Sequence, residues 1–282
     1  MIKVGFIDYY LDEWHANTAP AHLLEQSNGK VKACFAYGEI ASPKGVTSED
    51  WCEKMGVEYC ATISEVIEKS DVLMVFAPDN CERKEDLSRE ALASGKPCFV
   101  DKPFGTDLAS AKRMIEIAEK SGTPCYTCSA LRYAQEYTTV DRKAIKSLVA
   151  MCPQNSYDNY ILHALEPAMM LMGEPAKRVS AVKTDDAFYS VTIEMNSGRH
   201  IVISSLNYDS PYMMNICIPT RNQLIDCSYD FWIYHYKAMV EFFKTGKEPV
   251  SHKETLAIAA VREAGKKSLE SNGEWIMVDN NY

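Results

Sequence analysis

The stretch Val72-Leu-Met-Val-Phe-Ala77 decides the fold predicted for this sequence, because it is an uninterrupted apolar run of strand length. A short run without polar residues is typical of a strand that is buried on both faces of a parallel sheet. Strand-like and helical stretches alternate around it through residues 1–130. Such alternation predicts an α/β domain with a doubly wound parallel sheet, whose ligands bind beyond the carboxyl ends of the strands.

The pattern changes in residues 131–282, which we expect to form a second domain. Residues 134–175 have helical character, and several strand-like stretches then follow one another from Lys177 to about Asp226. Strands that follow one another without intervening helices imply antiparallel pairing. Two helices close the chain. The sequence therefore predicts an α+β domain with one open, mainly antiparallel sheet.

The charge of the chain limits its partners. The 282 residues include 30 Lys and Arg and 39 Asp and Glu, which gives a net charge of −9. An acidic chain without a basic stripe is poorly suited to bind nucleic acid or an anionic membrane. No apolar stretch approaches the ~20 residues of a membrane-spanning helix, and early acidic residues interrupt any signal peptide. We expect a cytoplasmic protein that binds small molecules.

The ten cysteines are interpreted as reduced, mostly buried thiols. Cys125-Tyr-Thr-Cys128 is the only C-x-x-C motif, and zinc sites of this kind normally need a second pair at suitable spacing. No such pair is present, so the sequence predicts no metal site.

The strongest local feature is Val100-Asp-Lys-Pro-Phe-Gly105, which follows a predicted strand at the ligand edge of the sheet. Pro103 restricts Lys102 to extended geometry, and an X-Pro bond can be cis. A fixed lysine can orient a substrate hydroxyl or donate a proton, and Asp101 is placed to pair with it. The alternative is that Asp-Lys-Pro is only a turn after a strand.

A second group of polar residues surrounds His163. Asn159 and His163 are four residues apart and share one face of a predicted helix, with Asp158 beside them. An imidazole suits the transfer of a hydroxyl proton, and the alternative is a half-buried structural histidine on an amphipathic helix. Arg132 and Tyr133 follow the last parallel strand. The arginine could bind a substrate oxygen or make a salt bridge.

These motifs together resemble the Gfo/Idh/MocA family of sugar and polyol oxidoreductases. The resemblance is carried by Ser70–Asn80, an apolar strand followed by a proline, and by Glu90–Phe104, a helix ending in Ala-Leu-x-x-Gly-Lys and a strand ending in Asp-Lys-Pro. Leu131-Arg132-Tyr133 is similar to the family's Arg-aromatic step, and Asn159-x-x-x-His163 to its Asp-x-x-x-His motif.

The resemblance implies a Rossmann-like N-terminal domain, NAD or NADP as cofactor, and oxidation of a secondary alcohol of a sugar, polyol or related molecule. It also implies a C-terminal sheet that is often used for oligomer contacts, and with the apolar residues Ile201, Ile203 and Leu206 to bury we expect a homodimer or homotetramer. By position, Lys102 would orient the hydroxyl and His163 would accept its proton, beside Asn159. The residues expected to line the cofactor are Asp8, Tyr9, Tyr10, Glu39, Pro78, Asp101 and Lys102, and those expected to contact substrate are Arg132, Tyr133 and Asp158.

One departure from the family pattern concerns the cofactor. The family has a G-x-G-x-x-G turn after its first strand, which allows close approach of the pyrophosphate. Asp8, Tyr10 and Glu13 take the three glycine positions here, and Gly5 lies inside the strand. Acidic side chains at this turn repel phosphates. The alternatives are therefore an active oxidoreductase with an unusual turn, a non-catalytic ligand-binding or regulatory protein, and a protein in which Lys102 and His163 serve no ligand.

Overall fold

The computed structural model describes residues 1–153, 155–185, 188–227 and 231–282. The chain divides into two compact units. The first comprises Met1–Thr127 and Tyr236–His252, and the second comprises Cys128–His235 and Lys253–Tyr282. A segment from late in the sequence therefore completes the N-terminal unit.

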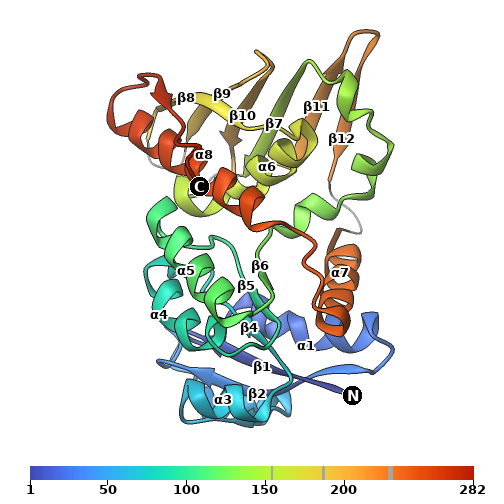
Figure 1. The fold of residues 1–282 in the computed structure, drawn as a ribbon, viewed down its shortest axis with the longest axis vertical. Helices are drawn as coiled ribbons and strands as arrows, with labels where there is room; N and C mark the ends of the chain where they lie inside the picture. Colours follow the sequence, from blue (N-terminus) through green and yellow to red (C-terminus); the bar gives the residue numbers. More distant parts are fainter. Residues whose placement is uncertain (154, 186–187, 228–230) are drawn as a thin grey trace. The chain divides into compact units, whose positions relative to one another are not determined.

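The first unit is built on a six-stranded sheet in the order β3-β2-β1-β4-β5-β6 (Figure 1). All its strand pairs are parallel, which confirms the prediction of a doubly wound sheet. The central strand β4 is buried along its whole length, as its apolar sequence requires. The strands are β1 (Ile2–Asp8), β2 (Val31–Gly38), β3 (Glu58–Tyr59), β4 (Val72–Val75), β5 (Cys98–Val100) and β6 (Cys125–Tyr126).

The helices of this unit follow the strands in alternation. The clearest is α5, which begins after Asp107, whose side chain accepts a hydrogen bond from the Ser110 amide, and ends at Gly122 in the left-handed conformation. The helices are α1 (Trp14–Gln26), α2 (Ser48–Met55), α3 (Ile63–Lys69), α4 (Cys81–Leu92), α5 (Leu108–Ser121) and most of α7 (Phe231–Thr245).

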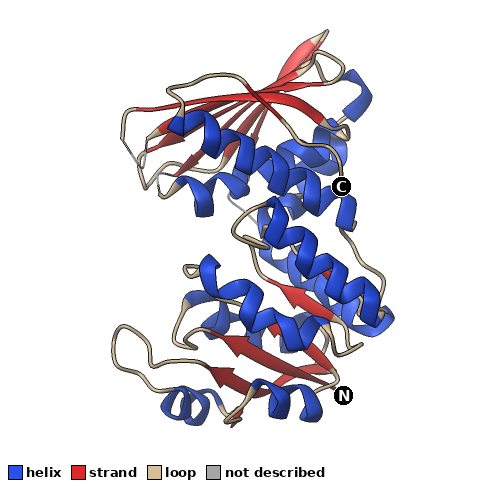
Figure 2. Cartoon of the chain, turned by 60° about the vertical axis from the view of Figure 1, so that its left-hand side comes forward, coloured by secondary structure: helices blue, strands red, loops and turns tan. Residues whose placement is uncertain are grey.

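The second unit contains a seven-stranded sheet in the order β12-β11-β7-β10-β9-β8-β13. Its pairs are antiparallel except β7 with β10, which confirms the predicted open, mainly antiparallel sheet. Figure 2 shows α6 (Tyr157–Met172) and α8 (His252–Glu270) along one face of this sheet. The strands are β7 (Ser147–Pro153), β8 (Ala176–Lys183), β9 (Tyr189–Met195), β10 (His200–Leu206), β11 (Met213–Ile218), β12 (Arg221–Asp226) and β13 (Ile276–Met277).

Strand β7 corrects the prediction that residues 134–175 are helical. Leu148, Ala150 and Cys152 are buried, and Val149 between them is exposed, so the burial has the period of a strand. β7 lies between β10 and β11, and this pairing over long sequence distances decides its conformation. Three short 3₁₀ helices precede it, at Ala130–Tyr133, Gln135–Thr139 and Arg142–Ala144.

Among the helices that the structure describes, none has both the length and the apolar character required to cross a membrane.

Candidate functional site

The turn between β1 and α1 is the place where a doubly wound sheet receives the phosphates of a nucleotide. Here it begins with Asp8, the last residue of β1, whose carboxyl group is buried. Its Oδ1 atom accepts hydrogen bonds from the Tyr9 amide at 2.7 Å and from the Ala77 amide at 2.9 Å. Asp8 therefore ties the end of β1 to the end of the neighbouring strand β4.

Glu13 ends the same turn and caps α1. Its carboxylate accepts a hydrogen bond from the His15 amide at 2.7 Å and another from the Ala16 amide. The first amides of any helix point away from its own carbonyl groups and form a natural anion-binding position. The chain's own carboxylate already occupies that position.

Burial strongly affects the ionisation of both acids. It raises the pKa of Asp8 to about 7, against the opposing effect of the hydrogen bonds from Ala77 and Tyr9. Burial, followed by repulsion from Asp8, raises the pKa of Glu13 well above its usual value. The turn thus holds two carboxyl groups whose charged forms are disfavoured.

Gly5 serves helix packing rather than phosphate binding. It lies within β1, and a Cβ atom added there would be 2.2 Å from Ser70 Oγ and 2.5 Å from a methyl carbon of Val66. The missing side chain lets α3 and the residue after it approach the strand. Residues 6–13 contain no other glycine.

The end of β5 carries the predicted lysine within a buried charged cluster. Lys102 is buried, and the Lys102–Pro103 peptide bond is cis. Asp101 Oδ2 lies 3.4 Å from His15 Nδ1, and the fully buried Lys84 donates from Nζ to the Asp101 carbonyl oxygen at 3.1 Å. Asp101 and Lys102 thus follow β5 directly, and they lie in a polar cluster as well as in a turn.

The charges of this cluster keep Asp101 ionised. Burial alone would raise its pKa, but His15, Lys84 and Lys102 together hold it below its usual value. Burial lowers the pKa of Lys84, although Asp101 opposes this effect. The cluster at the end of β5 therefore combines one stable carboxylate with two lysines.

The other residues expected to line a cofactor lie around this region of the first unit. Glu39 follows β2 and receives two hydrogen bonds from Arg83, at 3.1 and 2.7 Å. Its carboxylate is therefore engaged by an arginine. Pro78 is buried just after β4, and Tyr9 and Tyr10 are half-buried with ring centroids 6.1 Å apart.

In the second unit, His163 on α6 faces a hydroxyl group. Its Nδ1 atom lies 2.9 Å from Ser129 Oγ, and the rings of Tyr160 and Tyr212 pack edge-on against the imidazole. Asn159 lies one helical turn earlier on α6. An imidazole is suited to exchange a proton with a ligand near neutral pH.

Arg132 makes the salt bridges that were one of its two predicted roles. Its guanidinium lies 3.5 Å from Glu166 and 2.7 Å from Glu254, and the Arg132 and Glu166 side chains are almost fully buried. Burial raises the pKa of Glu166 to about 7, against the attraction of Arg132.

Asp158 and Tyr133, the other two residues predicted to contact substrate, have different neighbours. Asp158 is ion-paired with Lys266 of α8 at 2.6 Å, and the Tyr133 ring lies 5.6 Å from that of His235. The carboxylate of Asp158 is thus directed to α8.

Sequence reasoning missed Lys84, His15, Ser129 and Glu166 as members of these clusters. Only Lys84 left a recognisable signal, because it shares the buried face of α4 with Leu87, Ser88 and Ala91 at helical spacing. A lysine among core positions indicates a buried charge with a partner. The partners of the other three come from distant parts of the chain.

Comparison with known proteins supports the fold and the first unit's lineage. Residues 15–128 match the family model described as "Oxidoreductase family, NAD-binding Rossmann fold". The match begins after β1 and the β1–α1 turn. Inositol 2-dehydrogenase of Cereibacter sphaeroides is 34% identical over 67 residues, which are 24% of this chain and 20% of that protein. The matched stretch thus spans about a fifth of this curated relative.

Solved structures resemble the chain over nearly its full length. A probable dehydrogenase from Thermotoga maritima has a TM-score of 0.79 at 16% identity, covering 98% of this chain and 99% of that one. Scyllo-inositol dehydrogenase from Lactobacillus casei, solved with NAD(H) and scyllo-inositol, has a TM-score of 0.80 at 13% identity, with coverages of 98% and 99%. At these identities the likeness concerns the fold.

Proposed function

This chain belongs, through its N-terminal unit, to the Gfo/Idh/MocA oxidoreductase family, and on that premise we propose that it oxidises or reduces a secondary alcohol. The substrate class is a sugar, a polyol or a related small molecule, and the redox partner is NAD or NADP. The observation that carries this function is the buried Lys102 at the carboxyl end of β5, beside ionised Asp101 and within the segment that matches the family.

We assign the proton chemistry to Lys102 and His163. Lys102 orients the substrate hydroxyl and lowers the cost of its deprotonation, since its positive charge favours an alkoxide. His163 accepts the proton, and the contact of its Nδ1 atom with Ser129 Oγ orients the ring. Asn159 supports His163 without the charge of an aspartate. Tyr133 and Asp158 are proposed as substrate contacts, and Arg132 is proposed to hold Glu166 and Glu254 beside them.

The β1–α1 turn does not fit the pyrophosphate of a dinucleotide in the described conformation. Glu13 holds the amides of His15 and Ala16, and Asp8 holds that of Ala77. A phosphate placed there would meet two carboxyl groups in a site that has no glycine between Phe6 and Glu13. A dinucleotide bound by this unit must displace Glu13 or place its phosphates elsewhere, so we expect weak binding.

A second candidate function is supported by the same turn. The capped helix and the two buried acids favour a ligand-binding or regulatory protein that keeps the fold without the dinucleotide. Within the described part of the chain, Asp8 Oδ2 is buried and has no hydrogen-bond partner. A buried carboxyl oxygen of this kind can bind a hydroxyl or amide group of a ligand.

NADH and NADPH fluorescence titrations of the full chain separate the two functions. If the protein is an oxidoreductase, we expect saturable binding of NADH, NADPH or both. The second function predicts that neither binds at millimolar concentration, while members of a panel of sugars, polyols and small acids raise the melting temperature. That second result would remove the oxidoreductase assignment.

We also propose a cytoplasmic homodimer or homotetramer. No disulfide joins the ten cysteines, all of which lie in the described part of the chain, and this suits a reducing compartment. On the second sheet, Val149, Leu206 and Leu224 are exposed apolar side chains, and an apolar sheet surface favours association. Light scattering tests this assembly, and a monomer at micromolar concentration would contradict it.

A further inference from the structure

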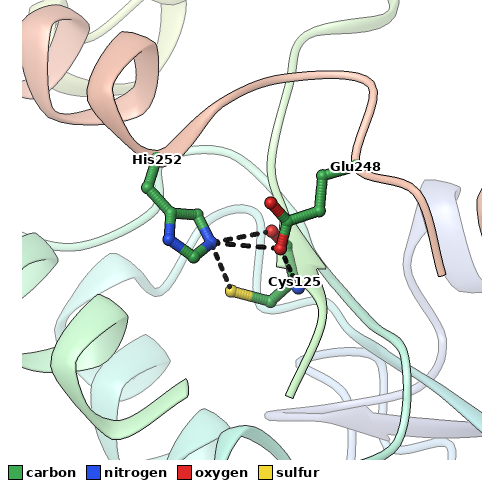
Figure 3. Close-up of side chains that lie close together, drawn as sticks. All are labelled: Cys125, Glu248 and His252. Carbon is green, nitrogen blue, oxygen red and sulfur yellow. Dashed lines mark hydrogen bonds and ion pairs between the residues drawn. The ribbon is translucent and has the colours of Figure 1, made fainter. Parts of the chain in front are cut away.

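Three side chains that bind transition metals converge in the first unit, away from the groups described above. Cys125 is the first residue of β6. Glu248 lies between α7 and α8, and His252 is the first residue of α8. Figure 3 shows the cysteine sulfur and a glutamate oxygen directed at one nitrogen of His252. One ligand atom from each residue lies within 4.8 Å of the other two.

Two of the three separations between ligand atoms are close to those around zinc. His252 Nε2 lies 3.4 Å from Cys125 Sγ and 3.2 Å from Glu248 Oε1. Tetrahedral zinc, with bonds of about 2.3 Å to sulfur and about 2.0–2.2 Å to nitrogen and oxygen, places its ligand atoms roughly 3.3–3.8 Å apart. An ion could therefore enter with only small movements of the three side chains.

Two further contacts hold the ligands in place. Glu119 at the end of α5 lies 3.0 Å from His252 Nδ1, which leaves Nε2 for a metal. A carboxylate on the second imidazole nitrogen is the usual support of a metal-binding histidine. The Cys125 amide donates to Glu248 Oε1 at 2.8 Å and fixes that carboxylate beside the strand.

We propose that Cys125, Glu248 and His252 bind a zinc ion, with Glu119 as the residue that positions His252. A set of one thiolate, one imidazole and one carboxylate suits zinc and excludes magnesium and calcium, which require oxygen ligands. Three protein ligands leave a fourth position for water, and the partial exposure of Glu248 and His252 gives solvent access to it.

The position of the site indicates what the metal does. Cys125 pairs with Cys98 at the beginning of β5, whereas Lys102 follows the end of β5. The zinc site therefore lies at the amino ends of the parallel strands, and Lys102 lies at their carboxyl ends. Zinc there joins the short edge strand β6 to the segment that completes the first unit, so it stabilises this unit and takes no part in alcohol chemistry.

The same residues without zinc form an ion-paired cluster. Hydrogen bonds to Cys125 and Glu248, with a further one to Glu119, raise the pKa of His252 to about 11. Burial raises the pKa of the Cys125 thiol, although His252 opposes this effect. In that case the imidazolium alone joins β6 to the segment before α8, and a metal titration distinguishes the two arrangements.

The test uses the full chain, freed of metal with a chelator and titrated with zinc in competition with a chromophoric chelator. We expect about one zinc per chain and a higher melting temperature with zinc. Cobalt(II) should give the absorption of a thiolate-bound ion. Cys125→Ser should abolish that absorption and lower the affinity for zinc at least 100-fold. Loss of a residue that only supports a ligand lowers metal affinity by about 10- to 100-fold, and loss of a ligand should have at least that effect.

Matched variants separate the site from general effects on thiols and histidines. Cys60→Ser changes another buried thiol of the first unit, and His22→Ala removes another of its histidines, so both should bind zinc as the parent does. Glu119→Gln should lower the affinity for zinc by about 10- to 100-fold and keep the cobalt absorption. If the parent binds no zinc, or if Cys125→Ser and Glu248→Gln bind it unchanged while folded by circular dichroism, the site is refuted.

Discussion

Glu13 accepts a hydrogen bond of 2.7 Å from the backbone amide of His15, so a side chain of the protein caps the helix that follows β1. In doubly wound sheets this helix end normally faces a phosphate. The contact therefore sets Glu13 and a dinucleotide in competition for the same amides.

Glu13→Ala should tighten dinucleotide binding and destabilise the fold. Removing the carboxyl group of Glu13 frees two backbone amides for a phosphate, and we expect the Kd for NADH or NADPH to fall about tenfold, equivalent to about 1.4 kcal/mol. Loss of the cap should lower the free energy of unfolding by about 1 kcal/mol. Asp107→Ala, which removes the acidic cap of α5, is the control and should leave the Kd unchanged. An unchanged Kd in Glu13→Ala would show that the phosphates bind elsewhere.

Asp8→Asn should flatten the dependence of stability on pH. The pKa of Asp8 is about 7 in the folded state and 3.8 ordinarily, so the folded state holds its proton more tightly. This contribution to stability is fully present below about pH 4 and is lost as pH rises through 7, with a total of a few kcal/mol. The variant lacks this loss and should be more stable than the parent at pH 8.

Urea unfolding between pH 4 and 8 measures the effect of Asp8. Glu68→Gln, a change of an exposed carboxylate in the same unit, is the control and should leave the slope as it is in the parent. The same slope in Asp8→Asn as in the parent would mean that Asp8 is ionised throughout this range.

Arg132→Met should destabilise the protein by about 3–5 kcal/mol, because it leaves the buried Glu166 without its cationic partner. Arg132→Lys keeps the charge and should lose less. Urea unfolding at pH 7 gives the comparison. A small loss of stability together with a large rise in KM would instead assign Arg132 to the substrate.

The sequence was sufficient for the architecture where local pattern decides it. The apolar run that begins at Val72 became the buried strand β4, and alternation of strands and helices predicted the parallel sheet correctly. Strand β7 was predicted wrongly as helix, because its pairing with β10 and β11 depends on residues far along the chain. Pairing of this kind leaves a weak signal in a single sequence.

The sites show the same division. The missing glycines identified the β1–α1 turn as unusual, but the bonds of Glu13 to the amides of α1 depend on the conformation of the turn. The residues of the proposed zinc site form no sequence motif, because Cys125 is 123 residues from Glu248 and 127 residues from His252. Buried charge pairs such as Arg132 with Glu166 also require the fold before their partners are known.

The measurement that tests the proposed activity most directly is reduction of NAD or NADP by the full chain with a panel of sugars and polyols, followed by nicotinamide absorbance. We predict turnover with at least one substrate, and a loss of at least about 100-fold in Lys102→Ala with the dinucleotide Kd within a few-fold of the parent value. The contradicting result is that neither dinucleotide binds or is reduced at millimolar concentration.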